Sequence, residues 1–276
     1  MAQFDSGFMR AEQMIDLERY PIEDLTSGEG AEFARLSRRQ FEETGLCMLP
    51  GFVRSQALDT LADEANGVAG QAYFCRSTHN PYLQLDDASL PDGHAKRRQE
   101  HTYVGSVAYD LVPEDGVLRR LYDWDPLKNF IAAVMGKTEL HRFADPFGAC
   151  SINVFCDGGQ HGWHFDESEF TVTLMLQPPE EGGAFEYVPR IRGLPDEYQI
   201  VDKVLDGARD GVNQLPFTPG TLLIFGGQQT LHRVTEVKGE RLRLVPVLCF
   251  SETPGVTNSE EVRKLFWGRS GPEVRP

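Results

Sequence analysis

EFTVTLMLQPPEEGGAFEYVP, residues 169–189, decides the fold that the sequence predicts. Two runs rich in β-branched and aromatic residues flank PPEEGG, a cluster of turn-forming residues. Connections this short cannot hold the helical crossovers that parallel strands need. The same pattern continues on both sides and predicts a mostly β region from 145 to 252, with an antiparallel sandwich or barrel. Its other β-rich runs are ACSINVFCD, GTLLIFGG, HRVTEV and RLRLVPVLCF.

The residues before 145 are typical of helices instead. Residues 22–45 carry apolar side chains at helical spacing and end in a glycine, and residues 55–70 repeat this pattern. A third helical stretch, residues 118–136, is divided at Pro126. The fold class that follows is α+β, with helices in the N-terminal half and a β core in the C-terminal half.

No shift in composition marks a linker, so we predict one domain over residues 1–276. In this interpretation residues 1–140 form the helical support and a substrate-side loop, residues 141–255 the β core, and residues 256–276 a C-terminal tail. The loop lies in residues 76–100, which are rich in Asn, Pro, Asp and Gly and show little periodicity. Long connections of this kind are functional or mobile.

The bulk composition excludes several classes of protein. A net charge of −15 would repel a nucleic-acid backbone. No apolar run is long enough to cross a bilayer, and the N-terminus lacks the basic start and apolar segment of a secretory signal. Five cysteines without a CxxC motif do not indicate a disulfide framework or a zinc cluster. We therefore expect a cytoplasmic protein that binds neither nucleic acid nor membrane; the sequence is compatible with a homodimer.

Three residues have the pattern of a metal site. His164 and Asp166, in HGWHFDESEF (161–170), have the period of a strand and leave the same face of an extended segment. His232, at the start of another β-rich run, supplies a third ligand. Two histidines and a carboxylate occupy one face of an octahedral Fe(II) ion and leave three positions open for a co-substrate and dioxygen. Each residue alone is ordinary, because a lone histidine in a sheet is more often structural.

Arg243 adds a fourth element to this pattern. It lies among apolar residues of RLRLVPVLCF, where a buried guanidinium needs an anion, and the distal carboxylate of a dicarboxylate co-substrate would provide one. Arg241, two residues earlier on the same face, competes for this role, and we favour Arg243. Asn153 and Thr173 lie in core strands and could hydrogen-bond the co-substrate, but alternation alone does not say which face points inward.

HFD, GTLLIFGGQQTLHRV and RLR together resemble the Fe(II)/2-oxoglutarate-dependent oxygenase superfamily, whose pattern is His-x-Asp, a distal His, and an Arg after ten intervening residues. The resemblance implies a double-stranded β-helix, or jelly roll, buttressed by the N-terminal helices. It also implies Fe(II) and 2-oxoglutarate as cofactors and O2 as co-substrate. Three longer stretches are similar to the BesD/HalB-like group of free-lysine halogenases and amino-acid hydroxylases: HGWHFDESEFTVTLMLQPPEEGGAFEYVPRIR, VAYDLVPEDGVLRRLYDWDPL and VTEVKGERLRLVPVLCFSETPG.

One position in that group separates two reactions. Its halogenases have glycine in place of the metal-binding carboxylate, and chloride takes the vacated site; here the position is Asp166. The resemblance therefore implies hydroxylation of a C–H bond in a free amino acid, lysine-like or otherwise polar, or in a similar small metabolite, with succinate and CO2 as co-products. Desaturation, cyclisation and halogenation remain alternatives, as does a non-catalytic jelly-roll module that binds a ligand. A cupin-like enzyme would need a His-x-His cluster, which is absent from the sequence.

The resemblance also suggests substrate contacts. His161 matches a substrate-contacting histidine of the group, and simple alternation places it on the face opposite His164, away from the metal. Arg98, in a basic cluster of the 76–100 loop, could bind a substrate carboxylate. Asp145 could accept a substrate ammonium, although a turn role is equally compatible. VPVLCF, residues 245–250, offers no polar contact where lysine-specific members would be expected to have one, which leaves the amino acid open.

Overall fold

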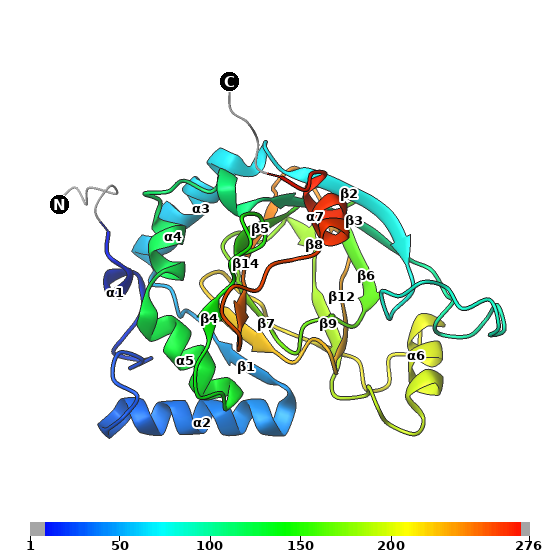
Figure 1. The fold of residues 1–276 in the computed structure, drawn as a ribbon, viewed down its shortest axis with the longest axis horizontal. Helices are drawn as coiled ribbons and strands as arrows, with labels where there is room; N and C mark the ends of the chain where they lie inside the picture. The colour runs from blue at the N-terminus through cyan, green and yellow to red at the C-terminus, as the bar shows by residue number, and fades with distance from the viewer. Residues whose placement is uncertain (1–8, 272–276) are drawn as a thin grey trace.

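The structure is a computed structural model and describes residues 9–271. Its centre is an eleven-stranded antiparallel sheet that curls on itself, so that β6, β9 and β12 lie opposite β5, β7 and β14 (Figure 1). The strand order is β1-β11-β7-β14-β5-β3-β6-β12-β9-β10, with β2 on the outer edge of β3. The strands of this sheet are β1 Leu46–Leu49, β2 Tyr73–His79, β3 Glu100–Val107, β5 Cys150–Phe155, β6 Gln160–His164, β7 Thr171–Leu174, β9 Phe185–Val188, β10 Asn213–Gln214, β11 Leu222–Phe225, β12 Leu231–Val234 and β14 Arg243–Leu248.

Two small ribbons complete the β structure. They pair β8 with β13 and β4 with β15, and their bounds are β4 His141–Arg142, β8 Glu181–Gly182, β13 Val237–Lys238 and β15 Phe250–Ser251. The seven α-helices of the described residues are α1 Ala11–Met14, α2 Gly28–Thr44, α3 Ser55–Ala69, α4 Val117–Tyr122, α5 Asp125–Met135, α6 Glu197–Leu205 and α7 Glu260–Trp267.

The apolar run of β11 shows how the sheet divides the core. Leu222 and Ile224 pack outward into the cluster shared with the helices, while Leu223 and Phe225 pack into the interior of the curled sheet. All four side chains are buried, because both faces of this strand are covered. The sequence of β11 is therefore a continuous apolar run rather than an alternation of apolar and polar residues.

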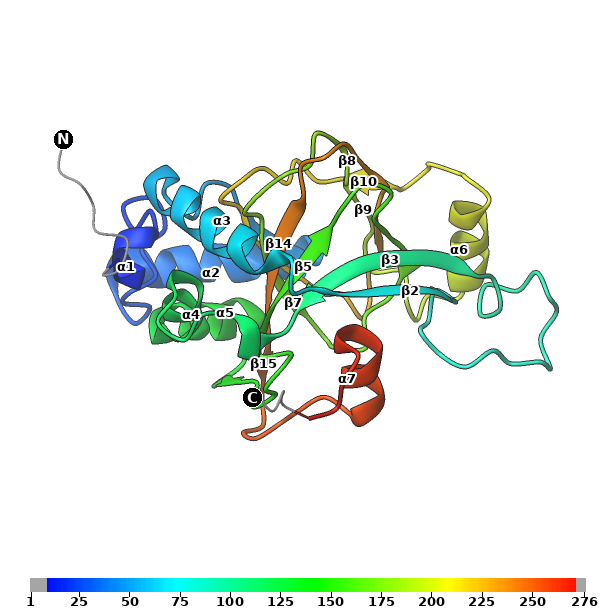
Figure 2. The ribbon, with the colours of Figure 1, turned by 90° about the horizontal axis from the view of Figure 1, so that it is seen from above.

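Helices cover the outer face beside β5, β7 and β14, at the left of Figures 1 and 2. Gly45 ends α2 in a left-handed conformation that glycine adopts at no steric cost. Phe33 of α2 stacks on Phe130 of α5 with ring centroids 5.3 Å apart, which joins the two helices. Phe130 is fully buried, a contribution of about 1.5–3 kcal/mol.

The opposite outer face has a second cover. The loop 80–99 and α6 lie together at the far side of the molecule from the N-terminal helices (Figure 2). They bury outward-pointing side chains of the barrel such as Trp163, Phe165 and Leu231 in one cluster. Arg98 ties the two covering segments together, since its Nη1 donates to the carboxylate of Asp206 at 2.7 Å. The loop is therefore attached to α6.

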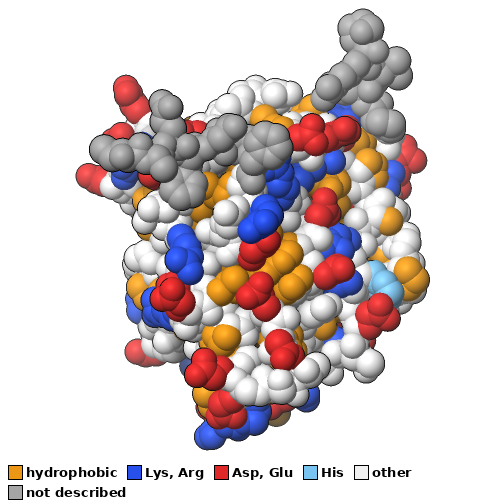
Figure 3. Space-filling model, turned by 90° about the vertical axis from the view of Figure 1, so that its left-hand side faces the viewer, with side chains coloured by type: hydrophobic (Ala, Val, Ile, Leu, Met, Phe, Trp, Pro, Cys, Tyr) orange, Lys and Arg blue, Asp and Glu red, His pale blue; other side chains and the backbone are white. Residues whose placement is uncertain are grey.

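The face formed by the N-terminal helices carries interspersed acidic and basic side chains around small apolar areas (Figure 3). Several of these charges are paired along α2, as in Arg38–Glu42 and Arg39–Glu43. No described helix combines the length and apolar character that a membrane span requires.

The predicted α+β class and jelly-roll core are confirmed, and so are the three predicted helical regions with the break before Pro126. The prediction of a long loop over residues 76–100 is wrong at its start, because β2 extends to His79 and pairs with β3. β2 is an edge strand whose polar side chains face outward, so this part of the sequence lacks the apolar residues that usually indicate a strand. Two amphipathic helices, α6 and α7, were not predicted within the β region and the C-terminal tail.

Candidate active site

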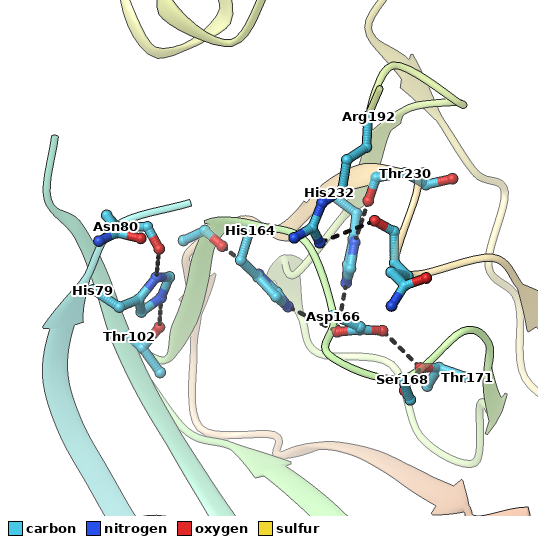
Figure 4. A network of polar contacts seen from close by, with 12 residues as sticks. His79, Asn80, Thr102, His164, Asp166, Ser168, Thr171, Arg192, Thr230 and His232 are labelled. Atoms are coloured by element: carbon cyan, nitrogen blue, oxygen red, sulfur yellow. Dashed lines mark hydrogen bonds and ion pairs between the residues drawn. The ribbon is translucent and has the colours of Figure 1, made fainter. Parts of the chain in front are cut away.

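The metal-site residues come together inside the barrel. Among residues 9–271, the His, Cys, Asp and Glu side chains close enough to share one ion are His164, Asp166 and His232, whose ligand atoms lie within 4.8 Å of one another. His164 on β6 pairs directly with His232 on β12, so both imidazoles project from the same face. Asp166 follows two residues after His164, and its Oδ1 lies 3.4 Å from the Nε2 of each histidine (Figure 4).

Hydrogen bonds fix the orientation of all three side chains. The Nδ1 of His164 lies 2.7 Å from the Gly162 carbonyl, and that of His232 lies 2.8 Å from the Thr230 carbonyl. Because a carbonyl can only accept, each Nδ1–H donates and each Nε2 keeps its lone pair for a metal. Thr171 donates to Oδ2 of Asp166 at 2.6 Å, which leaves Oδ1 directed at the histidines.

The protonation states also suit a divalent metal. Burial alone would raise the pKa of Asp166, but His232 and His164 outweigh it and hold that pKa well below its usual range. Burial and the neighbouring His232 lower the pKa of His164. An ionised carboxylate and neutral imidazole are the forms that bind metal. This donor set, two nitrogens and one oxygen on one side of the site, fits Fe(II).

Gly227 makes room for the carboxylate. A Cβ at this position would lie 2.0 Å from Oδ2 of Asp166, so any side chain there would displace it. The Gly227 carbonyl also accepts a hydrogen bond from the Asp166 backbone N–H at 3.0 Å. The backbone of Gly227 thus holds the turn that contains Asp166, and the absence of a side chain at Gly227 leaves space for the Asp166 carboxylate.

Arg243 is buried inside the barrel, where the sequence predicts an anion site. It is 2% exposed, its Nε donates to the Gly183 carbonyl at 3.0 Å, and its guanidinium lies over the ring of Phe155. Among residues 9–271 it forms no ion pair with a carboxylate, and burial lowers the pKa of Arg243 to about 9. A carboxylate of 2-oxoglutarate would supply the missing counter-charge.

Arg241 is placed differently from the expectation. It lies before β14 begins, so the alternation of the strand does not apply to it. Its side chain is exposed and donates to the carbonyls of Pro178 and Pro179 at 2.9 and 2.8 Å. These contacts turn Arg241 outward and leave Arg243 as the arginine of the interior.

Asn153 and Thr173 both face the interior. Asn153 on β5 lies opposite Val245 of β14, two residues from Arg243 and on the same face, and its Oδ1 accepts a hydrogen bond from Ser106. Thr173 shares the face of Thr171, whose hydroxyl reaches Asp166. Its own Oγ1 is buried without a partner among the described residues. The role of Asn153 and Thr173 in binding the co-substrate stays a prediction.

His161 does not lie on the face that simple alternation predicts. Its ring stacks on that of His164 with centroids 3.8 Å apart, so the two lie side by side rather than on opposite faces. The cause is a bulge: His232 pairs with His164 but Val234 pairs with His161, so three steps on β6 match two on β12. His161 is still outside the group of metal-ligand atoms.

Two other substrate candidates are already engaged. Asp145 is 1% exposed and accepts hydrogen bonds from three backbone N–H groups and from Nε of Arg263 on α7. A substrate ammonium would find no spare acceptor there, which corrects the expectation: Asp145 fastens α7 to the barrel. Arg98 donates to Asp206 and to the Asp202 carbonyl, so its ion pair would have to open before it could bind a substrate.

Comparison with known proteins agrees with this geometry. The family model described as Halogenase D matches residues 30–265. The chain belongs to the halogenase D family. Among curated proteins no sequence matches it.

Solved structures share the fold at low sequence identity. An oxidoreductase of the 2OG-Fe(II) oxygenase family from Burkholderia pseudomallei is 18% identical, covers 84% of this chain and 94% of its own, and has a TM-score of 0.51. A prolyl hydroxylase from Trichoplax adhaerens is 12% identical over 83% and 96%, with a TM-score of 0.54. The carbocyclase SnoK of nogalamycin biosynthesis is 14% identical over 88% and 94%, with a TM-score of 0.55.

These likenesses show the fold, and the family model shows the family. The shared fold, the family and the candidate metal site formed by His164, Asp166 and His232 agree with the Fe(II)/2-oxoglutarate-dependent oxygenase that the sequence predicts.

Several residues that shape the site were not predicted from the sequence. Thr171 was detectable, because Thr-x-Thr in EFTVTLML places Thr171 and Thr173 on one face. Gly227, in GGQQTLH (226–232), was also detectable, because a glycine beside a strand often marks a place where the backbone closely approaches another group. His79 and Thr102 left no such signal, because their contact depends on the pairing of β2 with β3.

Proposed function

We propose that this oxygenase hydroxylates an unactivated C–H bond in a free amino acid, lysine-like or otherwise polar, or in a similar small metabolite. The observation that carries the proposal is the intact carboxylate at position 166, held by Thr171 and given space by Gly227. With Asp166 in place, no protein-ligand position is vacant for chloride. The resemblance to amino-acid hydroxylases supports the substrate class.

The site residues divide the work as follows. His164, Asp166 and His232 would hold Fe(II) on one side and leave the other side open. Arg243 would bind the distal carboxylate of 2-oxoglutarate, with Asn153 and Thr173 beside it. Bound iron and 2-oxoglutarate supply the oxidising chemistry, in which O2 and 2-oxoglutarate are consumed, succinate and CO2 are released, and one oxygen atom enters the substrate.

The substrate would enter on the side of His161, whose ring lies beside His164. This placement favours His161 as a substrate contact, because it borders the metal without joining the ligand set. The rings of Phe185 and Phe225 pack against that of His232, with centroids 5.5 and 4.9 Å away, and would help to exclude water from the reacting centre.

The test is aerobic incubation of Fe(II)-loaded protein with 2-oxoglutarate, chloride and a pool of free amino acids, followed by mass spectrometry. We expect succinate to accumulate and one amino acid to gain one oxygen atom. Succinate without any change in the pool would contradict the amino-acid substrate. Absence of both, in folded and iron-bound protein, would favour a ligand-binding module.

Halogenation is the second candidate, and family membership favours it. The same incubation separates the two reactions, because a chlorinated product carries an isotope doublet and a hydroxylated one does not. A chlorinated amino acid formed with Asp166 in place would contradict the proposed role of this carboxylate. Loss of two hydrogens would indicate desaturation or cyclisation instead.

A further inference from the structure

A buried asparagine organises the chain where β2 leaves the barrel. Asn80 is 1% exposed and directly follows His79, the last residue of β2. Its Oδ1 accepts from the backbone N–H groups of Tyr82 and Gln84 at 3.0 and 3.3 Å, and its Nδ2 donates to the Gln84 carbonyl at 2.7 Å. We call residues 80–84 the Asn80 turn.

The Asn80 turn contains a strained residue. Leu83 has a φ of +53°, a left-handed conformation that residues with a side chain rarely adopt. Its N–H donates to the Asn80 carbonyl at 3.0 Å. Strain of this kind persists only where surrounding contacts enforce it, and it gathers at functional sites.

The turn contacts the metal-binding segment directly. The Pro81 carbonyl accepts a hydrogen bond at 2.8 Å from the N–H of Phe165, the residue between His164 and Asp166. The ring of Tyr82 lies 5.3 Å from that of Phe165. The backbone between two metal ligands is therefore docked on the Asn80 turn.

The turn also holds an imidazole at the wall of the site. Nδ1 of His79 lies 3.1 Å from the Asn80 carbonyl, and its Nε2 lies 2.7 Å from Oγ1 of Thr102 on β3 (Figure 4). The carbonyl can only accept, so Nδ1 carries the proton and Nε2 accepts from the threonine. Held from both sides, the His79 ring meets the rings of His161 and His164 edge-on at 5.7 and 5.9 Å.

We propose that Asn80 is a positioning residue of this oxygenase, which acts through His79 to fix His161 and the substrate-side wall relative to the metal. The inference rests on the proposed function for its catalytic readout. The Asn80 side chain bonds within its own turn and to Asp86, and it reaches the site through the His79 ring, which borders both His161 and the metal ligand His164. Misplacement of a substrate by about 1 Å costs up to about a hundredfold in productive turnover.

The test uses Fe(II)-loaded Asn80→Ala, which frees the turn whose backbone carbonyl accepts from Nδ1 of His79, and Thr102→Val, which removes the donor to Nε2 of His79. The readout is hydroxylated product formed per succinate, with the amino acid that the pool experiment identifies. We expect about a tenfold fall in this ratio for each variant, and little further loss in the double variant, because both act through one ring. Thr78→Val is the matched control, since Thr78 is exposed on β2, and it should keep the wild-type ratio.

A second readout is independent of hydroxylation. In zinc-loaded protein, the ring NMR signals of His161 should move in Asn80→Ala and Thr102→Val but not in Thr78→Val. If the wild type forms no product, the proposed function fails, and these signals alone decide the positioning role. Folded variants that keep both the wild-type ratio and the wild-type His161 signals would overturn the inference, and so would additive losses. Thr102→Val preserves side-chain shape on a central strand, so the test survives if Asn80→Ala does not fold.

Discussion

The two sides of the active site are built by different means. On the co-substrate side, β5 and β14 pair without interruption from Arg243↔Phe155 to Leu248↔Cys150, and alternation alone sends Arg243 and Asn153 inward. On the substrate side, a bulge in β6 turns His161 beside His164, and the Asn80 turn is held by side-chain hydrogen bonds. The first arrangement follows from local pattern, whereas the second exists only once distant segments meet.

The largest effect should come from the metal ligand that the two sides share. Asp166→Ala removes the ligand oxygen, and we expect product and succinate formation to fall about a thousandfold or more. Glu167→Ala is the control, because Glu167 is exposed in the same turn and should leave turnover unchanged. Mass spectrometry of both products measures the effect. An Asp166→Ala protein with full activity would refute the metal site.

On the co-substrate side, Arg243→Gln should raise the KM for 2-oxoglutarate about a hundredfold, because a buried charged hydrogen-bonding partner is lost. Arg241→Gln should change this KM by less than about twofold, since Arg241 is exposed and contacts only backbone carbonyls. Succinate release at varied 2-oxoglutarate concentration gives both values. The reverse order would move the anion site to Arg241.

Substitution of Asp145 should lower the stability of the fold without changing catalysis. Burial raises the pKa of its carboxyl, but hydrogen bonds from backbone N–H groups and Arg263 outweigh burial and lower that pKa. The carboxylate therefore stabilises the fold above the unfolded-state pKa, and this stabilisation is lost as pH falls through the lower folded-state pKa. We expect Asp145→Asn to reduce the free energy of unfolding by about 2–3 kcal/mol at pH 7, and by less below about pH 4.

Denaturant unfolding at both pH values measures this difference, with 2-oxoglutarate KM as the second readout. The KM should stay at the wild-type value in folded Asp145→Asn protein, because Asp145 contacts α7 and its own turn rather than the site. Asp125→Asn, which breaks an exposed pair with Arg142, should cost less than about 1 kcal/mol. Equal losses from both variants would contradict the role of Asp145.

The smallest effect should come from losing the hydrogen bond that Thr171 donates to Asp166. Thr171→Val leaves Oδ2 of Asp166 without its donor, and we expect the Fe(II) dissociation constant to rise about tenfold. Thr171→Ser keeps the hydroxyl and should restore wild-type affinity. Thr173→Val, two residues along the same face, should change the KM for 2-oxoglutarate but not iron binding. Competition with a metal indicator measures iron affinity in all three.

Residues on regularly paired strands could be predicted from the sequence, whereas residues placed by irregular features could not. His164, Asp166, His232 and Arg243 lie on or next to paired strands, so spacing and chemistry were enough to find them. The face of His161 could not be predicted, because a bulge adds one residue that no local pattern announces.

Asp145 was misassigned for a related reason. Its partner Arg263 lies on α7, more than a hundred residues away along the chain, and the sequence does not show that they meet. β2 was missed because the polar side chains of an edge strand resemble those of a loop.

The isolation of Arg243 has a consequence for the kinetics of co-substrate capture. The chain carries a net charge of −15, so a dianion approaching from solution is repelled before it reaches the buried guanidinium. Raising ionic strength from 0.01 to 0.15 M shortens the screening length from about 30 to about 8 Å, which weakens the repulsion outside but barely affects an ion pair inside. Association of 2-oxoglutarate should therefore accelerate with salt while its dissociation stays constant. The protein as a whole would slow the encounter, and one interior charge would retain the ligand.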